Sequence, residues 1–147
     1  MMRTWGVVLV VLMATLAVAA DDAQESVEQM IARAEATPET QRAPIYIEIA
    51  RRQLVSADKA YTAGKYEDAR TAVAEIVTYS DKASAASGKS ARQIKSTEIA
   101  LRKIALRLRD IRRGLEFDEQ APVEAAANHL EKLRTDLLAR MFAKGTK

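Results

Sequence analysis

A long apolar stripe in the second half of the chain constrains its fold most. Between positions 90 and 115 one set of residues recurs every three or four positions: Ile94, Thr97, Leu101, Ile104, Leu108, Ile111 and Leu115. All but Thr97 are apolar, and the spacing places them on one face of an α-helix. Ser90 and Gln93 have the spacing of a capping box. The sequence therefore predicts a helix over 90–113 that buries one face against other helices.

Four further segments carry the same spacing of apolar residues. They cover residues 26–36, 44–63, 65–82 and 122–141, and the stretches between them include Pro38, Gly64, residues 84–90 and residues 116–121. Only 5 Gly and 3 Pro occur in 147 residues, which argues against a β-sandwich or barrel. Helices joined by short loops pack as antiparallel neighbours. We therefore expect an all-α fold, an antiparallel helical bundle of four to five helices that occupies residues 21–147 as one domain.

The first 20 residues have the pattern of a secretory signal peptide. Arg3 precedes a short apolar run over 6–18, and small residues follow up to Ala20. The alternative is a membrane anchor, but a spanning helix needs about 20 apolar residues. No cysteine occurs, so the chain has no residue for a lipid anchor or a disulfide. We expect an exported protein, periplasmic or secreted, from a bacterium.

The stretch 57–69 resembles the centre of a tetratricopeptide repeat. Its small residues Ala57 and Ala60 precede the turn Gly64-Lys65-Tyr66-Glu67-Asp68-Ala69, which has the family's form Gly-x-Tyr-x-x-Ala. The resemblance implies a single helical hairpin in which Tyr66 packs under the turn and Ala69 lets the helices approach closely. It also implies a protein-binding scaffold without catalysis. The whole chain is similar to bacterial exported helical proteins of unknown function.

Residues able to carry catalysis or hold a metal are scarce. His129 is the only histidine, no cysteine is present, and Ala126 stands where a Glu-x-x-His pair would need an acid. Gly88-Lys89-Ser90 lacks the earlier glycine of a phosphate-binding loop, because Ala83 occupies that position. We therefore expect no cofactor, no metal and no enzymatic activity.

Positive charge is concentrated in the segment that carries the long stripe. Residues 89–113 hold nine basic and two acidic side chains, a net charge of +7. Seven-residue rows bring Lys95, Arg102 and Arg109 together beside the stripe, and place Arg92, Ile99, Leu106 and Arg113 away from it. The candidate partner-binding residues are Ile99, Arg102, Leu106, Arg109 and Arg113.

Three interpretations of this helix remain open. It can be a central helix whose arginines pair with acidic residues of the second and third helices. It can present Ile99 and Leu106 to a protein partner, because apolar residues surrounded by arginine are typical of interfaces. It can also bind anionic lipid headgroups or another polyanion. Nucleic acid is not expected, because this helix has no aromatic residue for base stacking.

We therefore predict a non-enzymatic interaction or scaffold protein of the bacterial cell envelope or exterior. The alternative is a peripheral binder of anionic membrane surface. The sequence leaves the partner, the biological process and the oligomeric state open.

Overall fold

The computed structural model describes residues 24–143, which contain five α-helices, one short 3-10 helix and no strand. The elements are α1 (Val27–Ala36), η1 (Glu39–Gln41), α2 (Ala43–Thr62), α3 (Tyr66–Ala86), α4 (Ala91–Arg113) and α5 (Phe117–Ala143). The all-α prediction is confirmed. The expected signal peptide lies outside the described residues. None of the helices within 24–143 is long and apolar enough to cross a membrane.

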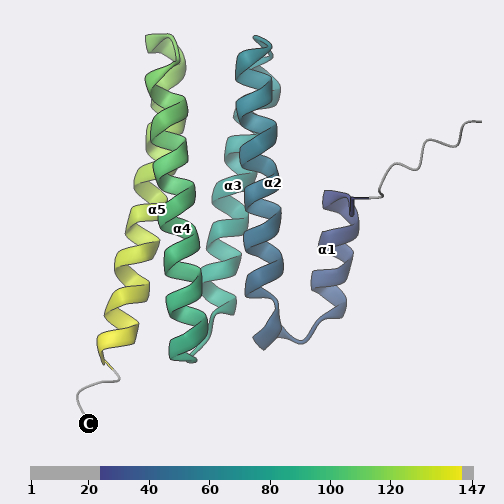
Figure 1. Ribbon diagram of the computed structural model, residues 1–147, viewed down its shortest axis with the longest axis vertical. Helices are drawn as coiled ribbons and strands as arrows, with labels where there is room; N and C mark the ends of the chain where they lie inside the picture. Colours follow the sequence, from purple (N-terminus) through teal and green to yellow (C-terminus); the bar gives the residue numbers. More distant parts are fainter. Residues whose placement is uncertain (1–23, 144–147) are drawn as a thin grey trace, which may run out of the picture.

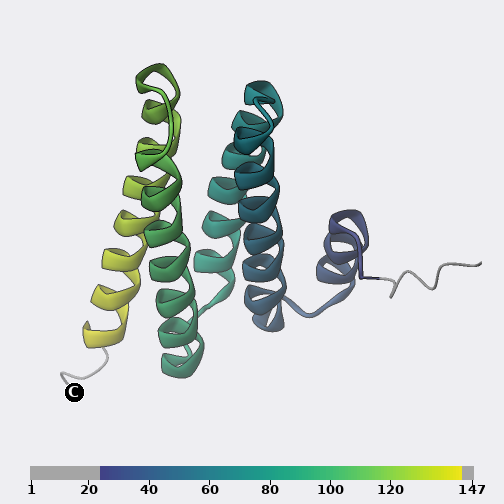
Figure 2. The same ribbon diagram turned by 45° about the horizontal axis from the view of Figure 1, so that its top comes forward.

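Two antiparallel hairpins form the body of the molecule (Figure 1). α2 packs most extensively against α3, and α4 against α5, so each hairpin joins helices that are neighbours in sequence. The hairpins then meet along two lines, α2 against α4 and α3 against α5. α1 is about half as long as the other helices, and among the described helices it packs only against α2, on the side away from α4 and α5 (Figure 2).

The helix ends follow the local signals in the sequence. Ser26 forms a capping box with Gln29, which satisfies two backbone groups at the start of α1. Gly64 has φ +72° in the α2–α3 turn, a conformation that residues with a Cβ adopt rarely. Ser90 caps α4 by accepting a bond from the Gln93 amide, but the Gln93 side chain donates to the Thr40 carbonyl at 2.7 Å. The capping box expected there is therefore only half formed.

The linker predicted over residues 84–90 is wrong in its first half. α3 continues to Ala86, and Ser84 and Ala86 are both buried. The Arg140 guanidinium, in the last turn of α5, donates to the Ser84 carbonyl at 2.9 Å. A partner far away in sequence therefore satisfies a backbone group in the last turn of α3, where helix carbonyls lack intrahelical bonds.

The loop predicted over residues 116–121 is also mostly helix. α5 begins at Phe117, so Pro122 lies inside it and does not open it. A proline there removes one backbone donor. Contacts to other elements support this first part of α5. Glu119 is buried and its carboxylate accepts two bonds from Arg70 of α3, and the Gln120 side chain donates to the Leu115 carbonyl after α4.

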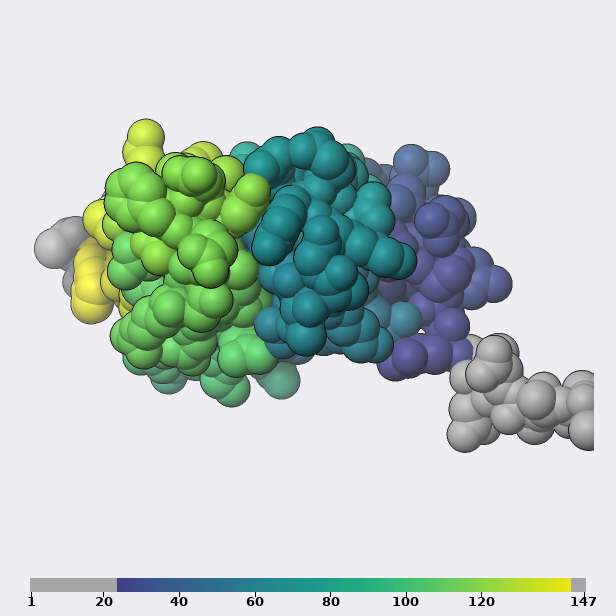
Figure 3. All heavy atoms as spheres, turned by 90° about the horizontal axis from the view of Figure 1, so that it is seen from above, coloured from purple at the N-terminus to yellow at the C-terminus, as the bar shows by residue number. Residues whose placement is uncertain are grey.

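The core runs the length of the bundle between the hairpins. Its fully buried large side chains include Ile49, Ile76, Leu101, Leu108 and Leu130. Residues 45, 47 and 49 alternate like those of a strand, yet all three isoleucines are buried in a helix. This happens because α2 has neighbours on three sides: α1, α3 and α4. Seen from above, the tips of the two hairpins lie side by side, with α1 beyond α2 (Figure 3).

Candidate functional site

α4 lies between α2 and α5, and the side of the helix that faces neither neighbour nor core carries four of the five predicted residues, all but Arg109. We call this side the α4 outer face, and it consists of Arg92, Lys95, Ile99, Arg102, Lys103, Leu106 and Arg113. Leu106 is 53% exposed, whereas Ile99 is only partly exposed. The heptad row drawn from the sequence therefore reaches solvent, most clearly at Leu106.

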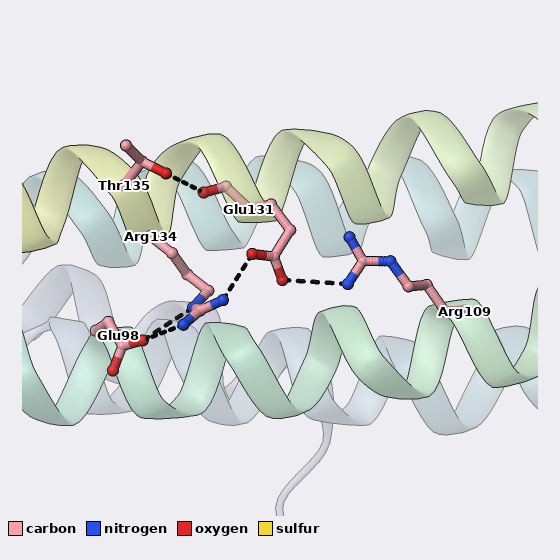
Figure 4. Close-up of polar contacts among 5 residues, drawn as sticks. All are labelled: Glu98, Arg109, Glu131, Arg134 and Thr135. Atoms are coloured by element: carbon pink, nitrogen blue, oxygen red, sulfur yellow. Dashed lines mark hydrogen bonds and ion pairs between the residues drawn. The ribbon is translucent and has the colours of Figure 1, made fainter.

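Arg109 does not belong to this face in the same way. Its guanidinium lies 3.3 Å from the Glu131 carboxylate of α5, so the side chain turns toward the neighbouring helix. Figure 4 shows Glu131 bridging Arg109 and Arg134, while Arg134 also reaches Glu98 on α4. The Thr135 hydroxyl donates to the Glu131 carbonyl at 3.1 Å in the same place. Arg109 is therefore part of a polar network that joins α4 to α5.

Arg134 is the centre of this network. Its guanidinium donates to one oxygen of Glu98 at 2.9 and 2.6 Å and to Glu131 at 2.6 Å. Burial works against its charge, but the bonds with Glu98 and Glu131 outweigh burial and raise the pKa of the guanidinium. The pair of Arg134 and Glu98 is the most buried ion pair of the described residues, with side chains 19% and 10% exposed.

Further ion pairs correct one of the interpretations drawn from the sequence. Arg107 contacts Asp58 of α2 at 2.7 Å, and Arg112 contacts Glu124 of α5 at 3.4 Å. The acidic partners were expected from the second and third helices. Within residues 24–143, α3 contributes none of them and α5 contributes more than α2. The expectation holds for the second helix, whose Asp58 pairs with Arg107, and is wrong for the third. α5 supplies the other acids because α4 and α5 form a hairpin and lie side by side along most of their length.

Cations without an acidic partner remain on the α4 outer face. Arg113 lies 3.1 Å from Asp110, one turn earlier on the same helix, and its side chain is 72% exposed. No carboxylate of residues 24–143 pairs with the other four basic side chains: Arg92, Lys95, Arg102 and Lys103. These four surround Ile99 and Leu106 along the helix. Of them only Arg102 is among the candidate partner-binding residues, although the same helical spacing could have identified the others.

Val55 on α2 is an exposed residue that the sequence reasoning missed. It is 52% exposed, and it precedes Asp58 by one turn of α2. Because Asp58 pairs with Arg107 and the two helices run in the same direction, Val55 lies within about one turn of the height of Leu106. No pattern in the sequence of α2 alone indicates this, since the register between α2 and α4 comes from the packing.

His129 has a structural partner. Its Nε2 lies 2.6 Å from an oxygen of Asp81, which joins α5 to α3. Among the described residues no group of three or more His, Asp and Glu side chains is placed to hold a metal ion.

Two of the small residues that carry the repeat resemblance are buried in the α2–α3 hairpin. Ala57 and Ala69 are both fully buried where the helices face each other. Tyr66 differs from the expectation, because it is 40% exposed and its ring centre lies 6.3 Å from that of Tyr61. It therefore lies at the surface of the turn and not beneath it.

Comparison of the chain with protein-family models, with curated proteins and with solved structures gives no match. The resemblance of residues 57–69 to a tetratricopeptide repeat therefore stays a prediction, and the fold and the α4 outer face have to be interpreted from their own geometry.

Proposed function

We propose that this chain is a non-enzymatic binding protein of the bacterial cell envelope or exterior, and that its α4 outer face docks an acidic protein partner. The observation that supports this proposal is the contrast between the two kinds of basic residue on α4. Arg107, Arg109 and Arg112 pair with neighbouring helices, whereas four other cations surround two aliphatic side chains and have no acidic partner within residues 24–143.

Charged and aliphatic side chains act on a partner in different ways. Exposed cations attract an acidic surface over about 8–10 Å at moderate salt, so they accelerate its approach and orient it. Leu106 and the exposed part of Ile99 then supply an apolar contact from which water is removed. The cations therefore raise the association rate, and the two aliphatic side chains lower the dissociation rate of the complex.

An anionic membrane surface is the competing partner, and the same cations would attract it. An interfacial helix, however, buries a broad apolar face among the lipids. The broad apolar face of α4 is already used in the core, where Leu101, Ile104 and Leu108 are buried. The outer face offers only Ile99 and Leu106 for insertion, which favours a protein partner.

The test is an affinity capture from the envelope fraction of the source organism, with three baits. The first is the unaltered chain, and the second carries Arg102→Glu with Lys103→Glu. The third is a matched control, Lys59→Glu with Lys132→Glu, which changes the net charge equally at exposed positions of α2 and α5. We expect one partner to be retained by the first and third baits and to bind the second at least about tenfold more weakly.

Two results would contradict the proposal. Equal loss of the partner from the second and third baits would show an effect of net charge alone. Binding of the first and third baits to phosphatidylglycerol vesicles, without a protein partner and with steep loss of binding as salt rises, would favour the membrane surface.

A further inference from the structure

A small cavity lies between the first halves of α2 and α4. Its volume is about 140 Å³, and its apolar lining includes Ala43, Ile47 and Ala100. Four side chains with hydrogen-bond donors also line it: Arg51 from α2 and Gln93, Ser96 and Thr97 from α4. The Gln93 amide already donates to the Thr40 carbonyl, which leaves the other three. The cavity is therefore apolar on one side and rich in donors on the other, which is the composition of a small-molecule site.

Thr97 shows that a donor in this cavity lacks its usual partner. The other threonines within the α-helices of residues 24–143 each donate to the carbonyl four residues earlier: Thr62, Thr71, Thr78 and Thr135. Thr97 is only 4% exposed and forms no such bond. Within the described residues, the side-chain atoms that are both sealed off from solvent and without a hydrogen-bond partner are the hydroxyls of Tyr61 and Ser80. The Thr97 hydroxyl is not one of them, so it can be reached from the solvent. A reachable, unpaired hydroxyl on a buried residue that lines a cavity is suited to hydrogen-bond a ligand.

Arg51 supplies a charge at the same place. Its side chain is 50% exposed, and its one acidic contact among residues 24–143, Glu48, is 3.8 Å away, near the limit of an ion pair. The guanidinium therefore keeps donors available for an anion. The hydroxyl of Ser96, one residue before Thr97, also has no hydrogen-bond partner within the described part of the chain. A guanidinium and two hydroxyls together match the acceptors of one carboxylate.

We propose that this cavity binds a short aliphatic monocarboxylate of about six non-hydrogen atoms, such as butyrate. The size follows from the volume, because an apolar cavity of about 150 Å³ accommodates benzene. The carboxylate contacts Arg51, Ser96 and Thr97, and the hydrocarbon lies against Ile47, Ala43 and Ala100. The inference does not depend on the α4 outer face, because it uses a different side of the helix.

The experiment is a titration of the purified protein with butyrate, followed by amide chemical shifts in two-dimensional NMR. Butyramide, which is uncharged and nearly the same shape, serves as the comparison ligand. We expect butyrate to shift the signals of residues that line the cavity, and butyramide to bind at least about tenfold more weakly. Thr97→Val keeps the shape of the side chain and should weaken butyrate binding about tenfold. Arg51→Gln should weaken it at least as much.

Matched controls separate the cavity from general effects. Lys59→Gln removes one positive charge elsewhere on α2, and Thr78→Val removes a hydroxyl from an exposed position on α3. Both should leave the affinity for butyrate unchanged. The proposal fails if butyrate shifts no cavity signal, if butyramide binds equally well, or if Lys59→Gln weakens binding as much as Arg51→Gln. Circular dichroism of each variant confirms that the fold is intact.

Discussion

Leu106 and Leu108 stand two positions apart on α4, and replacing each by Ala compares the α4 outer face with the core under one chemical change. Leu108 is fully buried, whereas Leu106 is 53% exposed. Both substitutions place the same residue in the same helix, so the contribution of helix propensity is equal in the two variants. Any difference in the free energy of unfolding therefore reports how much of each side chain other residues cover.

The magnitudes follow from these exposures. Removing Leu108 leaves a cavity between α4 and its neighbours, and such substitutions cost about 2–5 kcal/mol, so we expect about 3 kcal/mol here. At Leu106 only about half of the side chain leaves water on folding, and water fills the space of the lost methyl groups. That limits the cost to about 1 kcal/mol. The expected difference between the two variants is thus about 2 kcal/mol.

Urea unfolding monitored by far-ultraviolet circular dichroism measures this difference. The dependence of the free energy on urea should be the same for both variants and the unaltered chain, since a change in slope signals a change in the unfolded ensemble. Two equal costs of about 3 kcal/mol would refute the reasoning, because Leu106 would then be covered and unavailable to a partner. A small cost would make Leu106→Ala a folded variant suited to binding measurements.

Three further predictions concern the turns and ion pairs. Gly64→Ala should cost about 1 kcal/mol at φ +72°, whereas Gly114→Ala should be neutral or stabilising, and equal effects in thermal unfolding would contradict this. Glu98→Gln should lower the free energy of unfolding by about 1 kcal/mol in urea, because it weakens the two charged hydrogen bonds that Glu98 accepts from Arg134. An unchanged free energy of unfolding would show that water already screens this pair. The hydrogen bond from Arg33 lowers the pKa of Glu25, so the support that this bond gives α1 is complete above the unfolded carboxyl's pKa of about 4.3. NMR should show it lost as pH falls through the lower folded pKa, and pH-independent α1 signals would disprove the link.

Local signals in the sequence were sufficient to predict the helices and most of their ends. The apolar stripe of α4, the cap at Ser26 and the turn at Gly64 each depend on residues within one or two turns. Such features are predictable because their physics is contained in a short stretch of chain.

The two wrong boundaries depend on partners far away in sequence. A run of Ala and Ser over 83–87 is compatible with helix or loop, and the contact of Arg140 with Ser84 favours helix. Pro122 appeared to start α5, but the pair of Arg70 and Glu119 holds the preceding turn in place. Both contacts join residues about fifty positions apart, which no pattern in one segment contains.

The candidate binding residues were also predicted only in part, because contacts far apart in sequence decide which of their charges are paired. The row containing Ile99 and Leu106 came from helical spacing, and in the structure Leu106 is about half exposed and Ile99 less so. A cation of α4 lacks an acidic partner only where no carboxylate of α5 lies beside it. Glu131 of α5, for example, pairs with Arg109. The cavity with Thr97 was invisible in the sequence, where Thr97 appeared only as a polar interruption of the stripe.

The construction from two hairpins also has a consequence for the order of folding. Most contacts join helices that follow one another in the chain, and such local topologies fold quickly because little chain entropy is lost before contacts form. We expect the docking of the two hairpins to be the late event, because the contacts between them join residues far apart in sequence. The bonds that Arg107 donates to Asp58 and Arg70 donates to Glu119 each join residues 49 positions apart, so they form during that event. Weakening them should speed unfolding far more than it slows folding, so these ion pairs set how long the native bundle persists.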